Sequence, residues 1–418
     1  MRGSKKPLIL LLGNYRPSLI LARTFKKRGF SIVVGTHGCE RLCQYSNAVR
    51  STWSHSPLNS GPETLACELK AFSKANPNLV AIFPVAEEYV RMICENEALF
   101  DGLPSIVSMP SGLVRKCLDK EYMLTLAGSV DVPTTPFAYT SGQGKACHAG
   151  ECFVGYPMIV RPKDSTLRIN GSKAICIETE EELIECLKQH DLGRQDLLLQ
   201  RKFEGKRHNV YFAAANGEVT RLLHAKIERT DKIDGTGLAV EGQTLDTNHD
   251  VVEQTRRLVT ALGYDGIGCA QFLVNETTGA TSFLEINPRI AGNHALPEYA
   301  GLDLGWFNFQ RVVNKRISRR KISAPSGIRY CWTTGDLMGA KVAFLRKEIG
   351  LLTLFAWSIR ALISGARSDL HMVFSFKDPY PAITGLWRLI PRIFRWRQSA
   401  ISPGENTIYT HHQQGKLS

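Results

Sequence analysis

The sequence predicts an α/β protein, with a parallel sheet in its first part and an α+β arrangement in its central part. Residues 7–13 form a continuous apolar run, residues 18–28 have helical spacing, and residues 30–35 are apolar again. This strand–helix–strand order is typical of a parallel sheet covered by helices. Residues 79–83 are another short apolar run, which indicates a further buried strand of that sheet.

Two predicted hairpins support the α+β arrangement. Residues 209–215 and 218–224 are strand-like and flank Asn216-Gly217, the strongest short hairpin signal. Residues 271–274 and 281–287 alternate polar and apolar side chains, with turn-forming residues between them. Both pairs therefore predict antiparallel strands in the second half of the chain.

Composition bounds the class of protein but not its substrate. The 418 residues are enough for two or three domains, and 43% hydrophobic and 22% charged residues are ordinary for a globular protein. The net charge of +13 favours anionic partners, whether nucleotides, nucleic acids or lipid headgroups. The eleven cysteines contain no Cys-x-x-Cys, a usage typical of a reducing cytoplasm. The apolar run at residues 7–12 is too short for a signal peptide or a membrane span.

Two carboxylates follow the predicted strand at residues 79–83. Glu87 and Glu88 would point into a ligand crevice if they lie at the carboxyl end of a parallel strand. They would equally suit the first turn of a helix, where the helix dipole favours acidic residues. Both interpretations stay open.

The strand pair around residues 271–287 carries a candidate magnesium site. Side chains repeat with period two along a strand, so Glu285 and Asn287 project from the same face. With Gln271 opposite them, three oxygen-bearing side chains converge, and such ligands suit Mg²⁺, with Mn²⁺ as an alternative. Arg289 adds a positive charge nearby. The alternative is that Glu285 and Asn287 are ordinary solvent-facing residues.

Binding a nucleoside triphosphate also needs cations for its phosphates and a slot for its base. Lys120, Arg161 and Lys163 are suited to the phosphates, although each is also compatible with a simple surface charge. Residues 197–203 are suited to lining the base slot, with backbone groups of residues 200–202 facing the adenine edge.

The order of these residues over 111–303, ending in Phe-Leu-Glu-Ile-Asn-Pro-Arg, resembles the ATP-grasp superfamily. It is closest to the carbamoyl-phosphate-synthase-like, carboxylate–amine ligase type. The resemblance implies that Lys120 and Arg161 bind ATP phosphates, that Gln200, Arg201 and Lys202 form the hinge strand at the nucleotide, that Gln271, Glu285 and Asn287 hold the metal, and that Arg289 steadies phosphate or an acyl-phosphate. Arg201 stands where the family usually has an acidic residue, which leaves the nucleotide preference open.

The resemblance also implies a domain order. Residues 1–110 would be a pre-ATP-grasp α/β domain, and residues 111–310 a two-lobed ATP-grasp domain with a lid subdomain at about 155–200. Residues 311–418 would be a mainly helical C-terminal extension.

One loop resembles a phosphate-covering segment of the carboxylate–amine ligases. It spans residues 226–237, and the resemblance implies that Lys226 and Arg229 reach the γ-phosphate or the substrate carboxylate. Residues 231–242 contain three glycines and no apolar period, which predicts a mobile loop.

The function implied by the resemblance is an ATP-dependent ligase. A carboxylate would take the γ-phosphate, an amine would open the acyl-phosphate, and ADP and phosphate would be released. The expected partners are a small-molecule carboxylate and amine, and no nucleic acid. The alternatives are a non-catalytic Mg-ATP-binding regulatory module and a sugar-nucleotide glycosyltransferase, which would leave the Glu285–Arg289 string unexplained.

The C-terminal part holds a basic amphipathic segment. Residues 383–397 interleave tryptophans and aliphatic residues with four arginines. Such a helix either lies on an anionic membrane surface or packs on the catalytic core with its arginines in water. The expected location is the cytoplasm, with the inner membrane surface as the alternative that the first interpretation offers.

Overall fold

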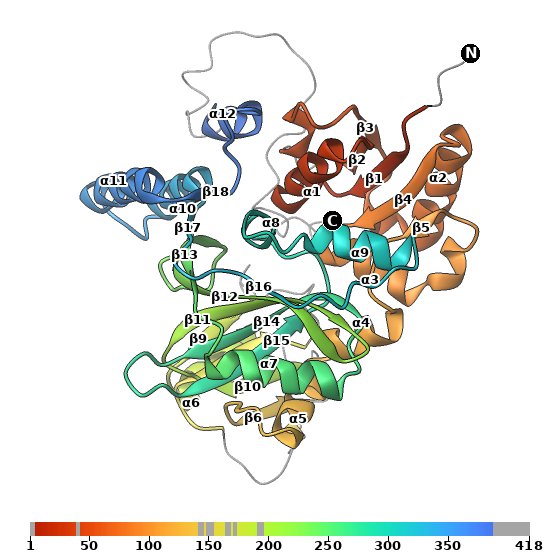
Figure 1. Ribbon diagram of the computed structural model, residues 1–418. Coiled ribbons are helices and arrows are strands. Elements are labelled where there is room, and N and C mark those ends of the chain that lie inside the picture. The colour runs from red at the N-terminus through yellow and green to blue at the C-terminus, as the bar shows by residue number, and fades with distance from the viewer. Residues whose placement is uncertain are drawn as a thin grey trace, which may run out of the picture.

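A computed structural model describes residues 5–38, 42–140, 146–147, 154–163, 169, 174–189 and 196–387. Its described strands form three sheets, of five, five and eight strands, and helices lie against all three. Figure 1 shows these sheets, with the helices of residues 333–387 at one side of the molecule. The predicted α/β class is confirmed.

The first sheet is parallel and has the order β3-β2-β1-β4-β5. Its strands are β1 (Leu8–Leu12), β2 (Ser31–Thr36), β3 (Ser51–Ser54), β4 (Leu79–Pro84) and β5 (Ser105–Ile106), and its helices are α1 (Arg16–Lys27), α2 (Pro62–Ala75) and α3 (Glu87–Glu95), with short 3₁₀ turns η1 (Cys43–Tyr45), η2 (Leu58–Ser60) and η3 (Glu97–Phe100). Strand β1 is buried along its whole length, because apolar residues cover both faces of a parallel sheet.

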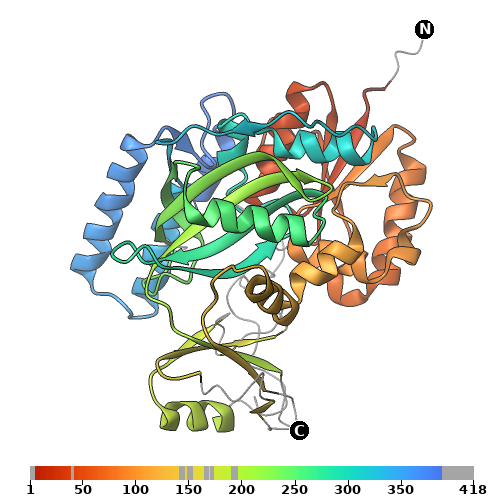
Figure 2. The ribbon, with the colours of Figure 1, turned by 60° about the horizontal axis from the view of Figure 1, so that its bottom comes forward.

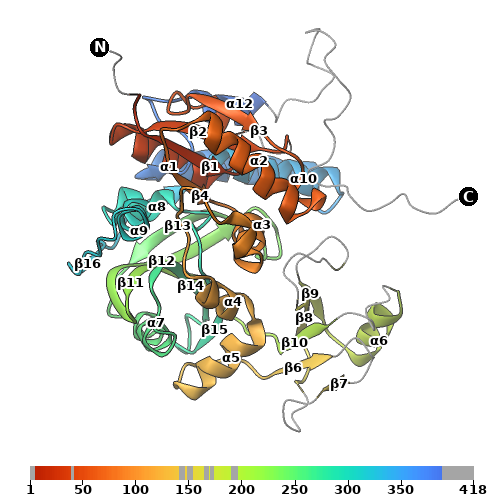
Figure 3. The ribbon, with the colours of Figure 1, turned by 90° about the vertical axis from the view of Figure 1, so that its right-hand side faces the viewer.

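A small antiparallel sheet forms the second unit, and Figure 3 shows it standing apart from the other two sheets. Helices α4 (Ser111–Leu118) and α5 (Lys120–Ser129) lead to it, and the Asp119 side chain caps α5 by accepting from the Tyr122 N–H at 3.1 Å. Its order is β7-β6-β10-β8-β9, from β6 (Phe137–Thr140), β7 (Ala146–Cys147), β8 (Met158–Pro162), β9 (Ile175–Ile177) and β10 (Leu197–Arg201), with helix α6 (Glu180–Gln189) beside it.

The largest sheet carries both predicted hairpins, and helix α7 (Asp250–Ala261) covers it in Figure 2. The order is β15-β14-β11-β12-β13-β17-β18, with β16 beside β12; the strands are β11 (Lys206–Ala215), β12 (Glu218–Thr230), β13 (Ala239–Leu245), β14 (Gly266–Val274), β15 (Thr281–Asn287), β16 (Ile322–Ser323), β17 (Arg329–Cys331) and β18 (Leu370–His371). Asn216 and Gly217 have φ of 50° and 81°, as a type I′ turn requires.

The predicted loops at residues 226–237 and 231–242 are shorter than expected. Strand β12 continues to Thr230 and β13 begins at Ala239, so only residues 231–238 connect them. The physical reason is pairing: β12 and β13 bond to each other, and β13 buries Ala239 and Val240. The sequence did not predict this strand, because its first residues follow a polar stretch that contains glycines.

The C-terminal helices are α8 (Ala295–Tyr299), α9 (Leu304–Val312), α10 (Thr333–Leu345), α11 (Leu351–Arg367) and α12 (Tyr380–Trp387). Phe25 of α1 packs on Trp306 and Phe309 of α9, with ring centroids 6.0 and 5.4 Å apart, so the parallel sheet and the largest sheet share one core.

The basic amphipathic segment is only partly covered by the described chain. Helix α12 includes its first residues, and residues 388–397 lie outside the described part. No helix within the described ranges is both long and apolar enough to cross a membrane. The domain boundaries, the cytoplasmic location and the membrane contact stay predictions.

Candidate active site

A cleft of about 500 Å³ lies where the three sheets meet. The parallel sheet contributes residues from the carboxyl ends of its strands, the small sheet contributes the end of β8, and the largest sheet forms the floor. Of the candidate residues named from the sequence, those that line this cleft are Glu87, Lys120, Arg161, Gln271, Glu285, Asn287 and Arg289.

The predicted metal ligands lie together on the floor. Gln271 of β14 is directly opposite Glu285 of β15, and the Asn287 Nδ2 donates to Glu285 Oε1 at 3.0 Å. Asn209 of β11 is opposite Gln271 in turn, so a polar row crosses three strands. Across the described ranges, no group of three or more histidine, cysteine, aspartate or glutamate side chains is arranged to hold a metal. The candidate set is therefore two amides and one carboxylate.

Arg161 is the most unusual cation of the cleft. Its Nε and Nη2 atoms are enclosed by the protein and have no hydrogen-bond partner. Burial lowers the pKa of Arg161, and the charge of Glu285 opposes that change. An enclosed guanidinium with two unused donors is suited to receive an anion with several oxygen atoms.

Lys120 and Lys163 have different surroundings. The Lys120 Nζ donates to the backbone oxygen of Lys163 at 3.1 Å, at the edge of the cleft. The Lys163 side chain does not line the cleft; its Nζ pairs with Glu121 at 2.9 Å. Its predicted contact with phosphate stays a prediction.

Arg289 connects the cleft to the parallel sheet. Its Nη2 pairs with Glu87 Oε2 at 3.0 Å, and both side chains are half-buried. Glu87 is the first residue of α3 and also lines the cleft. It is therefore both a first-turn residue of a helix and a carboxylate in the crevice. Glu87 keeps Arg289 beside the candidate metal ligands.

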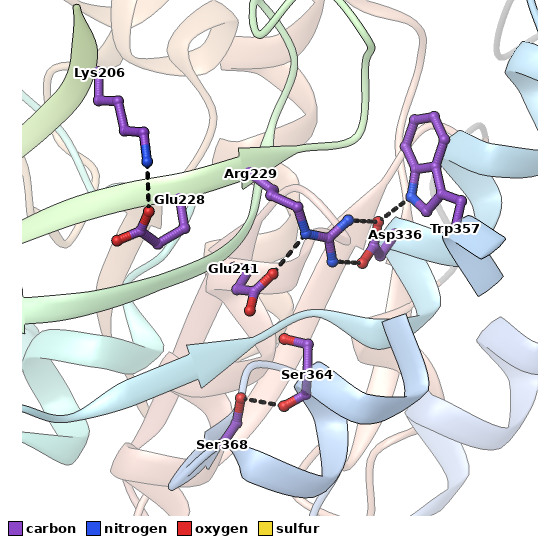
Figure 4. Close-up of polar contacts among 8 residues, drawn as sticks. All are labelled: Lys206, Glu228, Arg229, Glu241, Asp336, Trp357, Ser364 and Ser368. Carbon is purple, nitrogen blue, oxygen red and sulfur yellow. Dashed lines mark hydrogen bonds and ion pairs between the residues drawn. The ribbon is translucent and has the colours of Figure 1, made fainter. Parts of the chain in front are cut away.

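Lys226 and Arg229 do not line the cleft. Lys226 pairs with Glu276 and, at 3.0 Å, with Glu228. Arg229 donates to Glu241 at 2.6 Å and to both oxygens of Asp336, one of them at 3.1 Å (Figure 4). Their predicted contact with phosphate or substrate carboxylate stays a prediction.

Of the predicted hinge residues, Gln200 and Arg201 end β10 and Lys202 follows it, and none of the three lines the cleft. Gln200 is buried and Arg201 is exposed. The backbone N–H groups of Arg201 and Lys202 donate to Pro136 at 3.0 Å and Pro157 at 2.9 Å. Recognition of adenine at this strand stays a prediction.

Several cleft residues were not singled out from the sequence: Arg16, Arg207, Tyr211, Asp231, Lys232 and Asn293. Asn209 entered only as the first residue of a predicted strand. Arg16 begins α1, and three residues separate it from the end of β1, so its place near the carboxyl end of a parallel strand could have indicated a ligand contact. Asn209 was detectable only through its register with Gln271.

Residues 119–316 match the family model described as the ATP-binding domain of the carbamoyl-phosphate synthase L chain. The carbamoyl phosphate synthase large chain of Methanobrevibacter smithii is 30% identical over 173 residues, which are 37% of this chain and 16% of that protein.

The fold resembles two solved structures. They are a biotin carboxylase from Campylobacter jejuni in a complex with an ATP analogue (TM-score 0.57, 17% identity, 75% of this chain and 73% of that one) and the L-amino acid ligase from Bacillus licheniformis (TM-score 0.55, 14% identity, 74% of each chain). Residues 119–316 of this chain therefore match an ATP-binding domain of the ATP-grasp type, and the strand pair that carries Glu285 and Asn287 lies within the matched residues.

Proposed function

We propose that the chain is an ATP-dependent ligase that joins a carboxylate to an amine. The observation that carries the proposal is Arg161, which lines the same cleft as Glu285 and Asn287 and has two enclosed nitrogens without a hydrogen-bond partner. A buried cation without a bonded anion is costly unless a ligand completes it. A phosphate chain supplies such a ligand.

The cleft also fits a divalent cation. Glu285 and Asn287 are 3.0 Å apart at their bonded atoms, and Gln271 faces them across the strand pair. The carboxylate oxygens of Glu285 and the side-chain amide oxygens of Asn287 and Gln271 would hold Mg²⁺, or Mn²⁺ as the alternative, together with phosphate oxygens and water. When bound, the ion neutralises charge on the phosphates.

The chemistry then needs two steps. A carboxylate oxygen attacks the γ-phosphorus, and the bond from that phosphorus to the β–γ bridging oxygen breaks, which releases ADP and leaves an acyl-phosphate. The amine nitrogen attacks the acyl carbon, phosphate leaves with the bonding electron pair, and the nitrogen loses one proton. Arg161 and Lys120 would hold the phosphates, and Arg289 would face the transferred group. No protein nucleophile is required.

A second candidate is a non-catalytic Mg-ATP-binding module. Arg201 favours it, because an exposed cation stands at the predicted hinge where ATP-grasp proteins usually have an acidic residue. Phosphate release distinguishes the two candidates. Incubation with Mg-ATP and a panel of acids and amines, singly and in pairs, is expected to release ADP and phosphate only when an acid and an amine are both present. Nucleotide binding with no release across the panel would support the module.

A further inference from the structure

A second cavity, of about 530 Å³, adjoins the candidate active site. The two cavities share Asp231, Lys232 and Leu238 of the β12–β13 connection. The second cavity extends from there along α10. Its apolar lining includes Ile233, Leu238, Trp332, Met338, Val342 and Ala343. Its volume lies within the range of about 300–1,000 Å³ that small-molecule sites occupy.

Apolar side chains of the connection are exposed at this cavity. Ile233 is 59% exposed and Leu238 is 55% exposed, although both line a cavity with an apolar wall. An apolar ligand would remove them from water together with Met338 and Val342, which is favourable in proportion to the area covered.

Arg16 and Trp332 separate the two cavities. The Arg16 guanidinium lies 3.9 Å from the centroid of the Trp332 ring; Arg16 lines the cleft, and Trp332 lines the second cavity. Arg16 is 7% exposed, its Nε donates to the Gly292 oxygen at 3.0 Å, and its Nη2 donates to Asn293 Oδ1 at 2.8 Å. Its Nη1 is enclosed and has no hydrogen-bond partner. One donor of a buried cation is therefore unused at the junction.

We propose that the acid substrate is a carboxylate on an apolar chain, with its carboxylate on Arg16 and its chain in the second cavity. The proposal rests on the proposed ligase function and names the class of its acid. Arg16 lines the same cleft as Glu285 and Arg289, so a carboxylate bonded to it would lie in the cavity that is proposed to take the phosphates.

At the junction it is the unused donor of Arg16 that favours an acid over an amine, although the charge of Asp231 also acts on Arg16. Asp231 Oδ1 accepts from the Leu238 N–H at 2.6 Å, and Asp234 Oδ1 accepts from the Thr236 N–H at 2.9 Å. Glu348 lies 3.9 Å from Arg346. These carboxylates already have donors or a cation beside them, whereas the Nη1 of Arg16 has no acceptor.

The test is a binding series with acetate, butyrate, hexanoate and octanoate, measured by calorimetry on the full chain with Mg²⁺ and a non-hydrolysable ATP analogue. The dissociation constant is expected to fall about fourfold for each added methylene group that enters the cavity. The matching alcohols are expected to bind at least about tenfold more weakly, because they lack the charge that Arg16 recognises. A dissociation constant that does not change with chain length would overturn the proposal, and so would alcohols that bind as tightly as the acids.

Two variants locate the binding. Val342→Trp fills the cavity and is expected to weaken octanoate binding at least about tenfold while acetate binding is unchanged; Leu345→Trp, at a 67% exposed position of the same helix, is the matched control. Arg16→Gln is expected to weaken binding of every acid and to leave the alcohols unaffected. Equal octanoate binding by wild type and Val342→Trp would overturn the proposal even if Arg16→Gln fails to fold.

The affinity for the ATP analogue is measured first and separately. If the analogue binds and the acid series is flat, only the assignment of the acid fails. If the analogue does not bind, the proposed function fails with it.

Discussion

Two half-buried arginines of this protein, Arg161 in the cleft and Arg229 beside α10, have opposite surroundings. Arg229 donates through all three nitrogens, to Glu241 and to both oxygens of Asp336, and Trp357 Nε1 donates to the same Asp336 at 2.6 Å (Figure 4). Arg161 leaves two enclosed nitrogens unused. One guanidinium is saturated by the protein, and the other is not.

The pKa values change in opposite directions for the same reason. Burial disfavours the charged form of both arginines. For Arg229 the bonds to Asp336 and Glu241 outweigh burial and raise the pKa, whereas for Arg161 burial prevails and lowers it. In the proposed function, unused hydrogen-bonding capacity, and not charge alone, distinguishes the cation that would bind a phosphate.

The largest expected effect is that of removing Glu285, whose negative charge favours the charged form of Arg161. Glu285→Ala is expected to lower kcat by roughly 10³-fold or more, since it removes the only charged ligand of the candidate metal set. The fold is expected to persist, because Glu285 is half-buried and its one described bond is to Asn287. Phosphate release measures kcat, and circular dichroism shows whether the variant is folded. Glu276→Gln, in the same hairpin, is the control, and full activity of Glu285→Ala would end the metal assignment.

Arg229→Gln tests the saturated arginine. The substitution leaves Asp336, which is 2% exposed, without its cation, and breaking a buried ion pair costs about 3–5 kcal/mol. We expect a loss of about 3 kcal/mol in the free energy of unfolding, because Trp357 still donates to Asp336, and kcat/KM within a few-fold of wild type. Urea unfolding and steady-state kinetics measure these quantities. A 100-fold loss of activity at unchanged stability would instead support the catalytic role predicted from the sequence.

Arg161→Gln tests the unsaturated arginine. It is expected to lower kcat/KM about 100-fold, or about 2.7 kcal/mol of barrier, because a preorganised donor to the phosphates is lost. Stability is expected to stay the same or to rise, since no carboxylate loses a bonded partner. Loss of stability without loss of activity would remove the contrast between the two arginines.

Sequence periodicity was sufficient for the strands that carry the candidate site. Period-two alternation places Glu285 and Asn287 on one face, and Asn216-Gly217 fixes the β11–β12 hairpin, so both are local properties of the chain. The ATP-grasp resemblance added the order of the basic residues.

The hydrogen-bond partners of each arginine could not be predicted from the sequence in the same way. Asp336 lies 107 residues beyond Arg229, and Asn293 lies 277 residues beyond Arg16, so their partners depend on tertiary packing. Residues 239–242 show the same limit for secondary structure, because β13 is stabilised by pairing with β12 and β17 and not by its own pattern.

A third group of buried nitrogens, on the neighbouring strands β11 and β12, forms hydrogen bonds without a charge, and only His208 Nε2 among the ring nitrogens of His208 and His224 has no partner. His224 Nδ1 lies 2.9 Å from the backbone oxygen of Asp246, which can only accept, so Nδ1 carries the proton. His224 Nε2 must then accept from His208 Nδ1, also at 2.9 Å. Both rings are buried and neutral in this arrangement.

Acidification should therefore destabilise the protein. We expect this effect to be smaller than those of the three substitutions. Burial lowers the pKa of His208 to about 3 and that of His224 to about 4, below the unfolded value near 6.5. Between these values the unfolded chain binds protons that the folded chain does not, so stability is complete above pH 6.5 and falls as the pH decreases. We expect a loss of about 1–2 kcal/mol between pH 6.5 and 5.5, where most carboxylates stay ionised. Urea unfolding at both pH values measures it, and His208→Asn should halve the loss; an unchanged loss in that variant would assign it to other groups.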